Sequence, residues 1–213
     1  MLKYRRIIQA SARRIAAAAN RTVDDLAEHR VEHEPEFTSE MIGRMKESMN
    51  GYRVGGVLWT AKTLTSHGAN AQERRFGADF MGILDLDLPE YKVRKGFLAQ
   101  AKRIDWWGGM AGSEWDRMVD QCKTMLSITP ESFVFVYSPR DITVIPAISI
   151  ISAQQRSSLS DFYSRRLVRF YEDHFECFIG DMRLHAADIK ILEQLETRNG
   201  ILLRASTDET AAS

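Results

Sequence analysis

The sequence is poor in cysteine, in long apolar runs and in net charge, and each shortage excludes a class of protein. Its two cysteines, Cys122 and Cys177, lie far apart and form no CxxC pair, which argues against a disulfide framework and a zinc ribbon. No apolar run is long enough to cross a bilayer, and the N-terminus lacks the core of a signal peptide. We therefore expect a cytoplasmic protein without a membrane partner. No Walker-type GxxxxGKS or GxGxxG pattern occurs, so no nucleotide cofactor is expected.

The formal net charge is zero, with 29 basic and 29 acidic residues among 213. Such a chain has no global field that attracts a polyanion, so DNA binding would depend on local patches. Basic residues gather at two places, over residues 92–103 and over residues 165–169. For any single lysine or arginine, a solvated surface position is the commoner explanation.

Hydrophobic periodicity and turn signals predict a mixed α/β core over residues 36–151. The expected elements are a helix over 38–49, strands over 56–64, 80–88 and 96–104, a helix over 113–127, and strands over 132–137 and 141–145. The last two strands are almost wholly apolar, which predicts burial on both faces and a central place in the sheet.

Both ends of the chain are expected to be helical extensions. Residues 1–35 predict a helical arm with a break near 20–22, and residues 152–213 predict a C-terminal extension. Within that extension we expect a helix over 154–174, a short strand over 175–179, a helix over 186–198 and a disordered tail over 205–213.

The most informative part of the chain is the hairpin that Pro89 and Glu90 predict between the second and third strands. If the chain turns at these residues, Asp79 lies almost opposite Gln100. Side chains alternate along a strand with period two, so Gln100 and Lys102 share one face. Three polar groups would then converge on one spot.

At these residues the sequence resembles the PD-(D/E)xK superfamily of restriction-endonuclease-like nucleases. The resemblance lies in Gly77-Ala78-Asp79-Phe80 and Gln100-Ala101-Lys102. Within the superfamily, the sequence is similar to the Mrr-type branch, which has Gln at the variable acidic position. Ala78 replaces the proline of the name. The resemblance implies a mixed central sheet flanked by helices, and a Mg²⁺-dependent DNA endonuclease that serves prokaryotic defence against foreign DNA.

The resemblance also implies roles for individual residues. Asp79 and Gln100 would hold Mg²⁺, or Mn²⁺ as a substitute, through side-chain oxygens, and Ala101 would do so through its carbonyl. Lys102 would orient the attacking water and stabilise the anion. A neutral Gln weakens metal binding, so another acid would help. Glu40 on the first core helix is the matching position, with Glu36 and Glu47 as open alternatives.

The basic residues of the hairpin would contact DNA. They are Lys92, Arg94, Lys95 and Arg103. One chain supplies one active site and a weak field, so cleavage of both strands would require a homodimer or a partner subunit.

Two other functions compete with the nuclease. The stretch from His29 to His33 fits the HxxEH spelling of inverted zinc peptidases, but Pro35 follows closely and no third ligand is evident. A non-catalytic nuclease fold that serves as an interaction subunit of a larger complex is the main alternative, and the zero net charge fits it.

Overall fold

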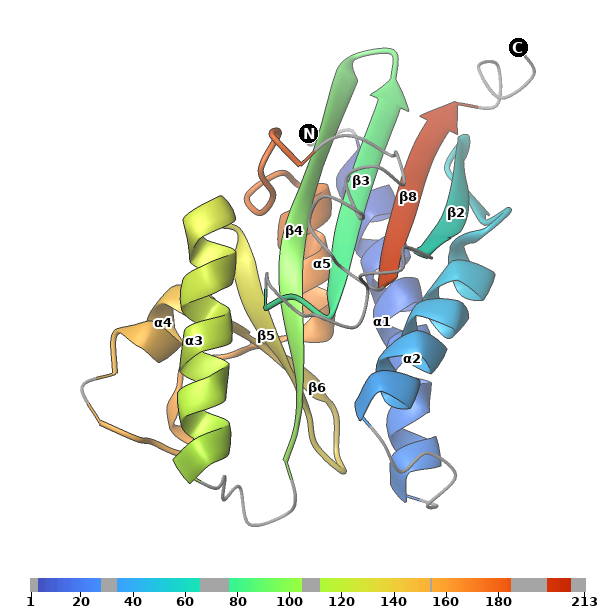
Figure 1. Cartoon of the computed structure of the whole chain (residues 1–213). Helices are drawn as coiled ribbons and strands as arrows, with labels where there is room; N and C mark the ends of the chain where they lie inside the picture. The colour runs from blue at the N-terminus through green and yellow to red at the C-terminus, as the bar shows by residue number, and fades with distance from the viewer. Residues whose placement is uncertain are drawn as a thin grey trace.

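Eight strands form one mixed sheet in the described part of the chain, which comprises residues 4–27, 34–65, 77–104, 112–153, 155–184 and 199–207 of a computed structural model. The strands are β1 (Arg53–Val54), β2 (Val57–Thr65), β3 (Phe80–Leu88), β4 (Tyr91–Arg103), β5 (Ser132–Tyr137), β6 (Ile142–Pro146), β7 (Arg165–Arg166) and β8 (Asn199–Thr207). Their order across the sheet is β1-β2-β8-β3-β4-β5-β6-β7 (Figure 1).

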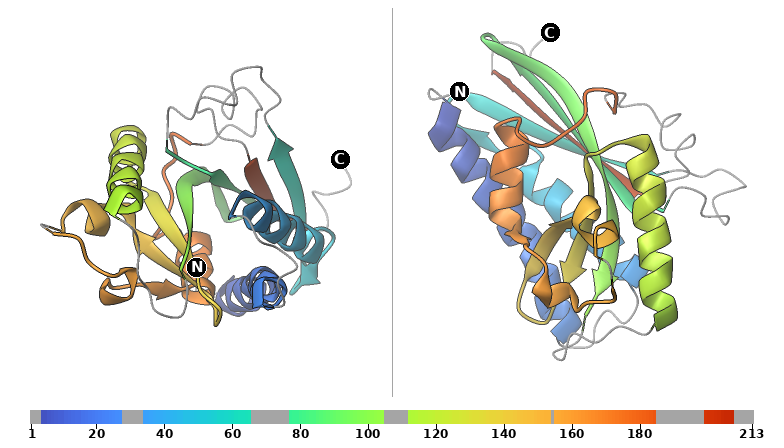
Figure 2. Two further views of the ribbon diagram at one scale, coloured as in Figure 1. Left: turned by 60° about the horizontal axis from the view of Figure 1, so that its bottom comes forward. Right: turned by 90° about the vertical axis from the view of Figure 1, so that its left-hand side faces the viewer.

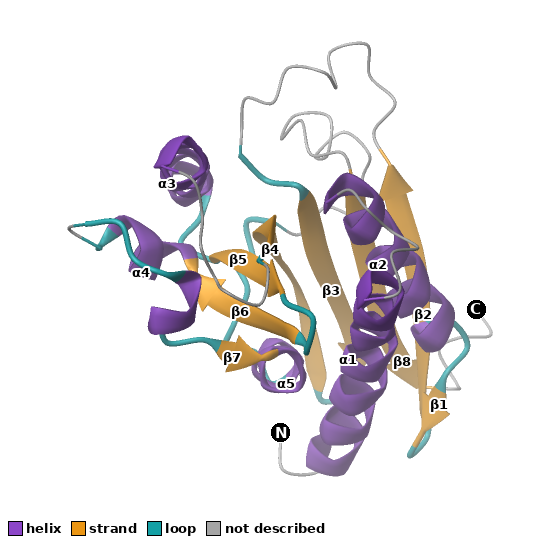
Figure 3. Ribbon diagram, turned by 90° about the horizontal axis from the view of Figure 1, so that it is seen from below, coloured by secondary structure: helices purple, strands orange, loops and turns teal. Residues whose placement is uncertain are grey.

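Helices cover both faces of this sheet. The helices are α1 (Arg5–Ala27), α2 (Glu34–Met49), α3 (Gly112–Ile128), α4 (Ala147–Ile151) and α5 (Leu167–Phe175), and a short 3₁₀ turn spans Leu159–Asp161. One apolar core joins α1, α2 and α5 to the sheet, and a second joins α3 and α4 to its other face. The right view of Figure 2 shows α1 and α3 on opposite sides, and Figure 3 shows α5 across β4 to β6 from α3 and α4. No helix in the described ranges is long and apolar enough to cross a membrane.

The elements expected in the central part of the chain are confirmed as an α/β arrangement. The predicted helices become α2 and α3, and the predicted strands become β2 to β6, with bounds that agree within a few residues apart from the earlier starts of α2 and β4. The expectation that β5 and β6 lie centrally is wrong, because they are sixth and seventh of the eight strands in the sheet order. Their burial is nevertheless nearly complete, since helices cover both of their faces.

The C-terminal part of the chain differs most from expectation. The helix expected over 154–174 is limited to α5, and the strand expected over 175–179 is a turn. Residues 205–207 belong to β8 and are not a disordered tail. This strand lies between β2, to which it is antiparallel, and β3, to which it is parallel. The helix expected over 186–198 and the rest of the tail lie outside the described residues.

The N-terminal helix α1 is part of the core, because residues such as Ile8, Ala12 and Ile15 are buried against α2 and α5. It runs without the expected break near residues 20–22. Pro35 lies in the first turn of α2, where a proline is tolerated because its missing N–H has no helical partner in any case. The HxxEH stretch, residues 29–33, lies outside the described residues.

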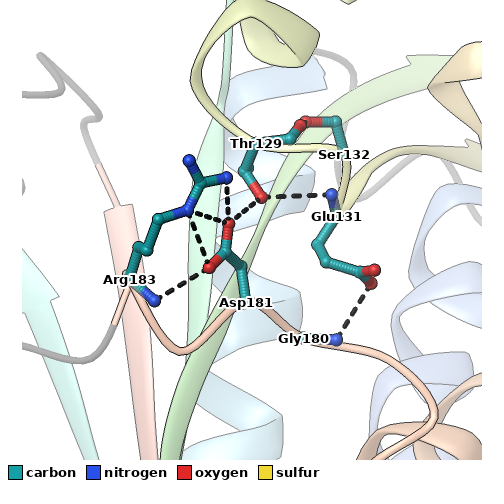
Figure 4. Close-up of polar contacts among 6 residues, drawn as sticks. All are labelled: Thr129, Glu131, Ser132, Gly180, Asp181 and Arg183. Carbon is teal, nitrogen blue, oxygen red and sulfur yellow. Dashed lines mark hydrogen bonds and ion pairs between the residues drawn. The ribbon is translucent and has the colours of Figure 1, made fainter.

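A polar cluster attaches the segment after α5 to the middle of β4. The backbones of Gly96 and Asp181 exchange two hydrogen bonds, with N···O distances of 2.8 and 3.0 Å. The Asp181 carboxylate accepts from the Thr129 hydroxyl at 2.8 Å and pairs with the Arg183 guanidinium at 2.6 Å. The Glu131 carboxylate accepts from the Gly180 N–H at 2.9 Å (Figure 4). Every group in this cluster thus has a partner.

Candidate functional site

The register of the β3–β4 hairpin confirms the placement of Asp79 opposite Gln100. Phe80 pairs with Ala99 across the antiparallel ladder, and the Asp79 N–H donates to the Ala99 carbonyl at 2.8 Å. The turn at Pro89 and Glu90 fixes this register, because strand pairing on either side of a tight turn has no freedom to slip by one residue.

Asp79 lies where β3 begins, and its carboxylate bonds to the neighbouring strand. The Oδ2 atom accepts a hydrogen bond from the Ala101 N–H at 2.9 Å and another from the Gln100 side-chain Nε2 at 2.5 Å. The carboxylate thereby satisfies a backbone donor of β4 at the point where the ladder with β3 has ended. Gln100 Nε2 also lies 3.3 Å from the Ala101 carbonyl. Asp79 therefore contacts both Gln100 and Ala101.

Gln100 and Lys102 point toward the face that α3 covers. Their neighbours Ala99 and Ala101 belong to the core beneath α1 and α2, and alternation along the strand sends the even-numbered side chains to the other face. Both polar residues are buried, with exposed fractions of 1% for Gln100 and 5% for Lys102. Among the described residues, the Oε1 atom of Gln100 has no hydrogen-bond partner.

Lys102 lies near the buried thiol of Cys122 on α3. Burial raises the pKa of Cys122 to about 12, and the positive charge of Lys102 partly opposes that rise. A thiol with so high a pKa carries almost no thiolate, the nucleophilic form, at neutral pH. Cys122 and Cys177 are both free in the described chain.

Glu40 lies on the first core helix and has a charged partner there. It lies on α2, whose apolar side packs against the face opposite Gln100 and Lys102, and its carboxylate pairs with Arg44 one turn later at 2.7 Å. Glu36 and Glu47 are exposed residues of the same helix. The catalytic role of Glu40 stays a prediction, with Glu36 and Glu47 as open alternatives.

The hairpin residues expected to bind DNA have other partners. Lys92 pairs with Asp87 at 2.9 Å and Arg94 with Asp85 at 3.1 Å, each directly across the ladder. The two charges of each pair neutralise each other. At about 3.3 Å per residue, Lys92 also lies roughly 26 Å along the strand from Gln100.

Lys95 is not a surface residue at all, since only 2% of it is exposed. Its ammonium donates to the carbonyls of His174, at 2.6 Å, and Ile179. Arg103 is half-buried and directly follows Lys102, so it is the member of the predicted set that remains next to the site.

The oxygens at this site suit a hard divalent cation. Mg²⁺ prefers oxygen ligands and keeps several waters, so one carboxylate with neutral amide and carbonyl oxygens is a sufficient protein contribution. A buried amide oxygen without a donor partner costs free energy unless a ligand or water satisfies it, and Gln100 Oε1 is such an atom. Among the described residues no group of three or more His, Cys, Asp and Glu side chains could hold a metal, so binding here would rely on these neutral oxygens.

Sequence reasoning missed the part that α3 plays. Gly77 adopts φ of +72°, and a Cβ atom there would lie 2.5 Å from the Gln121 carbonyl oxygen and 2.8 Å from its Cα. The segment that leads to Asp79 therefore runs directly against the backbone of α3, which only a glycine permits. Gln121 flanks the buried stripe of α3, and a polar residue in that place was the one available signal.

Comparisons with known proteins identify no relative. No protein-family model matches the chain, no curated protein matches its sequence, and no solved structure matches its fold.

Proposed function

We propose that this chain is a Mg²⁺-dependent DNA endonuclease with a restriction-endonuclease-like core, and that Asp79, Gln100 and Lys102 are its catalytic residues. The observation that carries the proposal is the buried Oε1 of Gln100, which lacks a partner while the Nε2 of the same amide contacts the Asp79 carboxylate. A cytoplasmic role in prokaryotic defence is the context that the resemblance to Mrr-type enzymes suggests.

The order of elements supports the fold assignment. From α2 the chain continues through β2, β3, β4 and α3 to β5, which is the αβββαβ order of the superfamily. The β3–β4 pair is antiparallel, and β5 returns parallel to β4 after α3. The insertion of β8 between β2 and β3 departs from a simple meander, but it leaves the unit from β3 to β5 contiguous.

The chemistry follows from the residues of this site. In phosphodiester hydrolysis, water attacks phosphorus while the bond to the leaving oxygen breaks. A bound Mg²⁺ would neutralise the phosphate charge and favour ionisation of a bound water. Asp79 Oδ1 and Gln100 Oε1 would hold that ion with the Ala101 carbonyl. The Lys102 ammonium would donate hydrogen bonds to the attacking water or to a phosphate oxygen, and its burial strengthens this interaction.

One observation favours a second function. The Asp79 carboxylate already accepts two hydrogen bonds from its own hairpin, which is also the arrangement of an acid that only stabilises the end of a strand. In that case the chain would be a non-catalytic interaction subunit of a larger complex. Under either function, DNA affinity would come from self-association or from a partner subunit, since the net charge is zero.

Cleavage of supercoiled plasmid separates the two functions. Purified protein should nick or linearise the plasmid with Mg²⁺ or Mn²⁺ and should be inactive with EDTA. Absence of cleavage across a wide range of protein concentrations would support the interaction subunit. A specific rate that rises with protein concentration would indicate self-association, and light scattering on the same samples would identify the oligomer.

A further inference from the structure

A second amide oxygen without a partner lies on α3, next to the candidate site. In the described ranges, the buried side-chain atoms without a hydrogen-bond partner belong to Ser11, Thr22, Trp59, Gln100 and Gln121. The first three are two hydroxyl groups of α1 and an indole N–H of β2. Of the five atoms, only the two glutamine oxygens can accept hydrogen bonds but cannot donate one.

Contacts of the backbone bring Gln121 to the segment that carries Asp79. Gly77, two residues before Asp79, lies so close to α3 that a Cβ atom there would be 2.5 Å from the Gln121 carbonyl oxygen. The next residue of α3, Cys122, lies close enough to Lys102 for its pKa to respond to the lysine charge. The backbone of Gln121 thus adjoins the approach to Asp79, and the next residue of α3 lies near Lys102.

We propose that Gln121 is a positioning residue of the metal site, whose Oε1 accepts a hydrogen bond from a water molecule bound to the divalent cation. This inference rests on the proposed function. Mg²⁺ and Mn²⁺ keep several of their waters when proteins bind them, and these waters need acceptors. A buried oxygen that lacks a donor meets that need. This role could not be predicted from the sequence, because the apolar pattern of a helix does not show which segment of the chain packs against it.

The test is calorimetric titration of the whole chain with Mn²⁺. Outer acceptors of a metal site typically change affinity about 10- to 100-fold, so Gln121→Met should weaken Mn²⁺ binding by about tenfold. Gln121→Glu should tighten binding, because a carboxylate accepts from a metal-bound water more strongly than an amide does. Melting temperatures of both variants check that the fold is intact.

Two controls make the result decisive. Ser127→Glu adds the same charge to an exposed position of α3, so equal tightening by this variant would mean a general charge effect and would overturn the proposal. Asp79→Asn reports on the site itself. If Asp79→Asn loses binding while both Gln121 variants match the wild type, the role of Gln121 is wrong and the metal site stands. If the wild type binds no Mn²⁺, both proposals fall.

Discussion

Two buried polar groups on β4 face opposite sides of the sheet and differ in how well they are satisfied. Lys95 faces α5, where its ammonium donates to the carbonyls of His174 and Ile179 at the end of that helix. The nearby Asp181 cluster is closed in the same way, with a donor for each carboxylate. Gln100 faces α3 and leaves its Oε1 without a partner.

This difference suggests how to tell buried polar groups that stabilise the fold from buried polar groups that bind a ligand. A polar group that only holds the fold together gains nothing from an unpaired donor or acceptor, because burial of such an atom costs about 1–3 kcal/mol. An open acceptor persists where a ligand satisfies it. Under the proposed function, the Lys95 side of β4 serves stability and the Gln100 side serves chemistry, and four variants or conditions test that division.

The largest expected effect is that of Lys102→Met on plasmid cleavage. Loss of one donor to a developing anion typically lowers the rate roughly 100- to 1000-fold, and we expect a loss of this size. Only 5% of Lys102 is exposed. Methionine keeps the buried stem, so the unfolding free energy should change little. A cleavage rate equal to that of the wild type would remove Lys102 from the mechanism.

Lys95→Met should lower the stability of the protein and leave metal binding unchanged, the opposite of Lys102→Met, which should lower activity and leave stability unchanged. Its loss leaves two buried carbonyls at the end of α5 without their charged donor, so the unfolding free energy should fall by about 2 kcal/mol. Mn²⁺ affinity should stay within about twofold of the wild type, because the side chain lies on the other face of the sheet. Lys92→Met, at an exposed position of the same strand, is the matched control and should cost less than about 0.5 kcal/mol.

Gly77→Ala should affect both stability and metal binding, because it perturbs the fold in the segment that leads to Asp79. Alanine is strained at φ of +72°, and its Cβ would collide with the backbone of Gln121. We expect a loss of about 2 kcal/mol in unfolding free energy, together with weaker Mn²⁺ binding as Asp79 shifts. Denaturant titration and calorimetry of the same sample measure both. Retention of full stability and affinity would show that α3 does not position this segment.

The pH dependence of stability reports on the Lys95 side alone. Burial, with the nearby Lys95 charge, lowers the pKa of His174 from 6.5 to about 3. The folded protein keeps this ring neutral, whereas the unfolded chain protonates it below pH 6.5. Stability from this residue is therefore complete above that pH and is lost as the pH falls toward 3.

The expected slope is about 1.4 kcal/mol per pH unit between pH 6 and pH 4. Asp181 adds a loss only at lower pH, because hydrogen bonds from Arg183 lower its pKa from 3.8 to about 2. Urea unfolding at a series of pH values measures the slope. His174→Phe keeps the ring packing and should flatten it between pH 4 and pH 6; an unchanged slope would assign the effect to other groups.

The sequence predicted the hairpin and its polar pair but not their surroundings. The register around Pro89 and Glu90 is local, because a tight turn and period-two alternation fix which residues face each other. The position of β8 is not local, since its parallel pairing with β3 joins residues more than a hundred apart in the chain. The same limit hid the burial of Lys95, whose partners His174 and Ile179 lie in the last turn of α5 and in the turn that follows it.

Calorimetric titration of Mn²⁺ into wild-type protein and Asp79→Asn tests the central claim most directly, because it asks whether the open side of β4 holds a cation. The account predicts one site in the wild type and an affinity at least about tenfold weaker in Asp79→Asn, since that change removes the carboxylate of the site. Equal affinity in the two proteins, or no binding by the wild type, would contradict it.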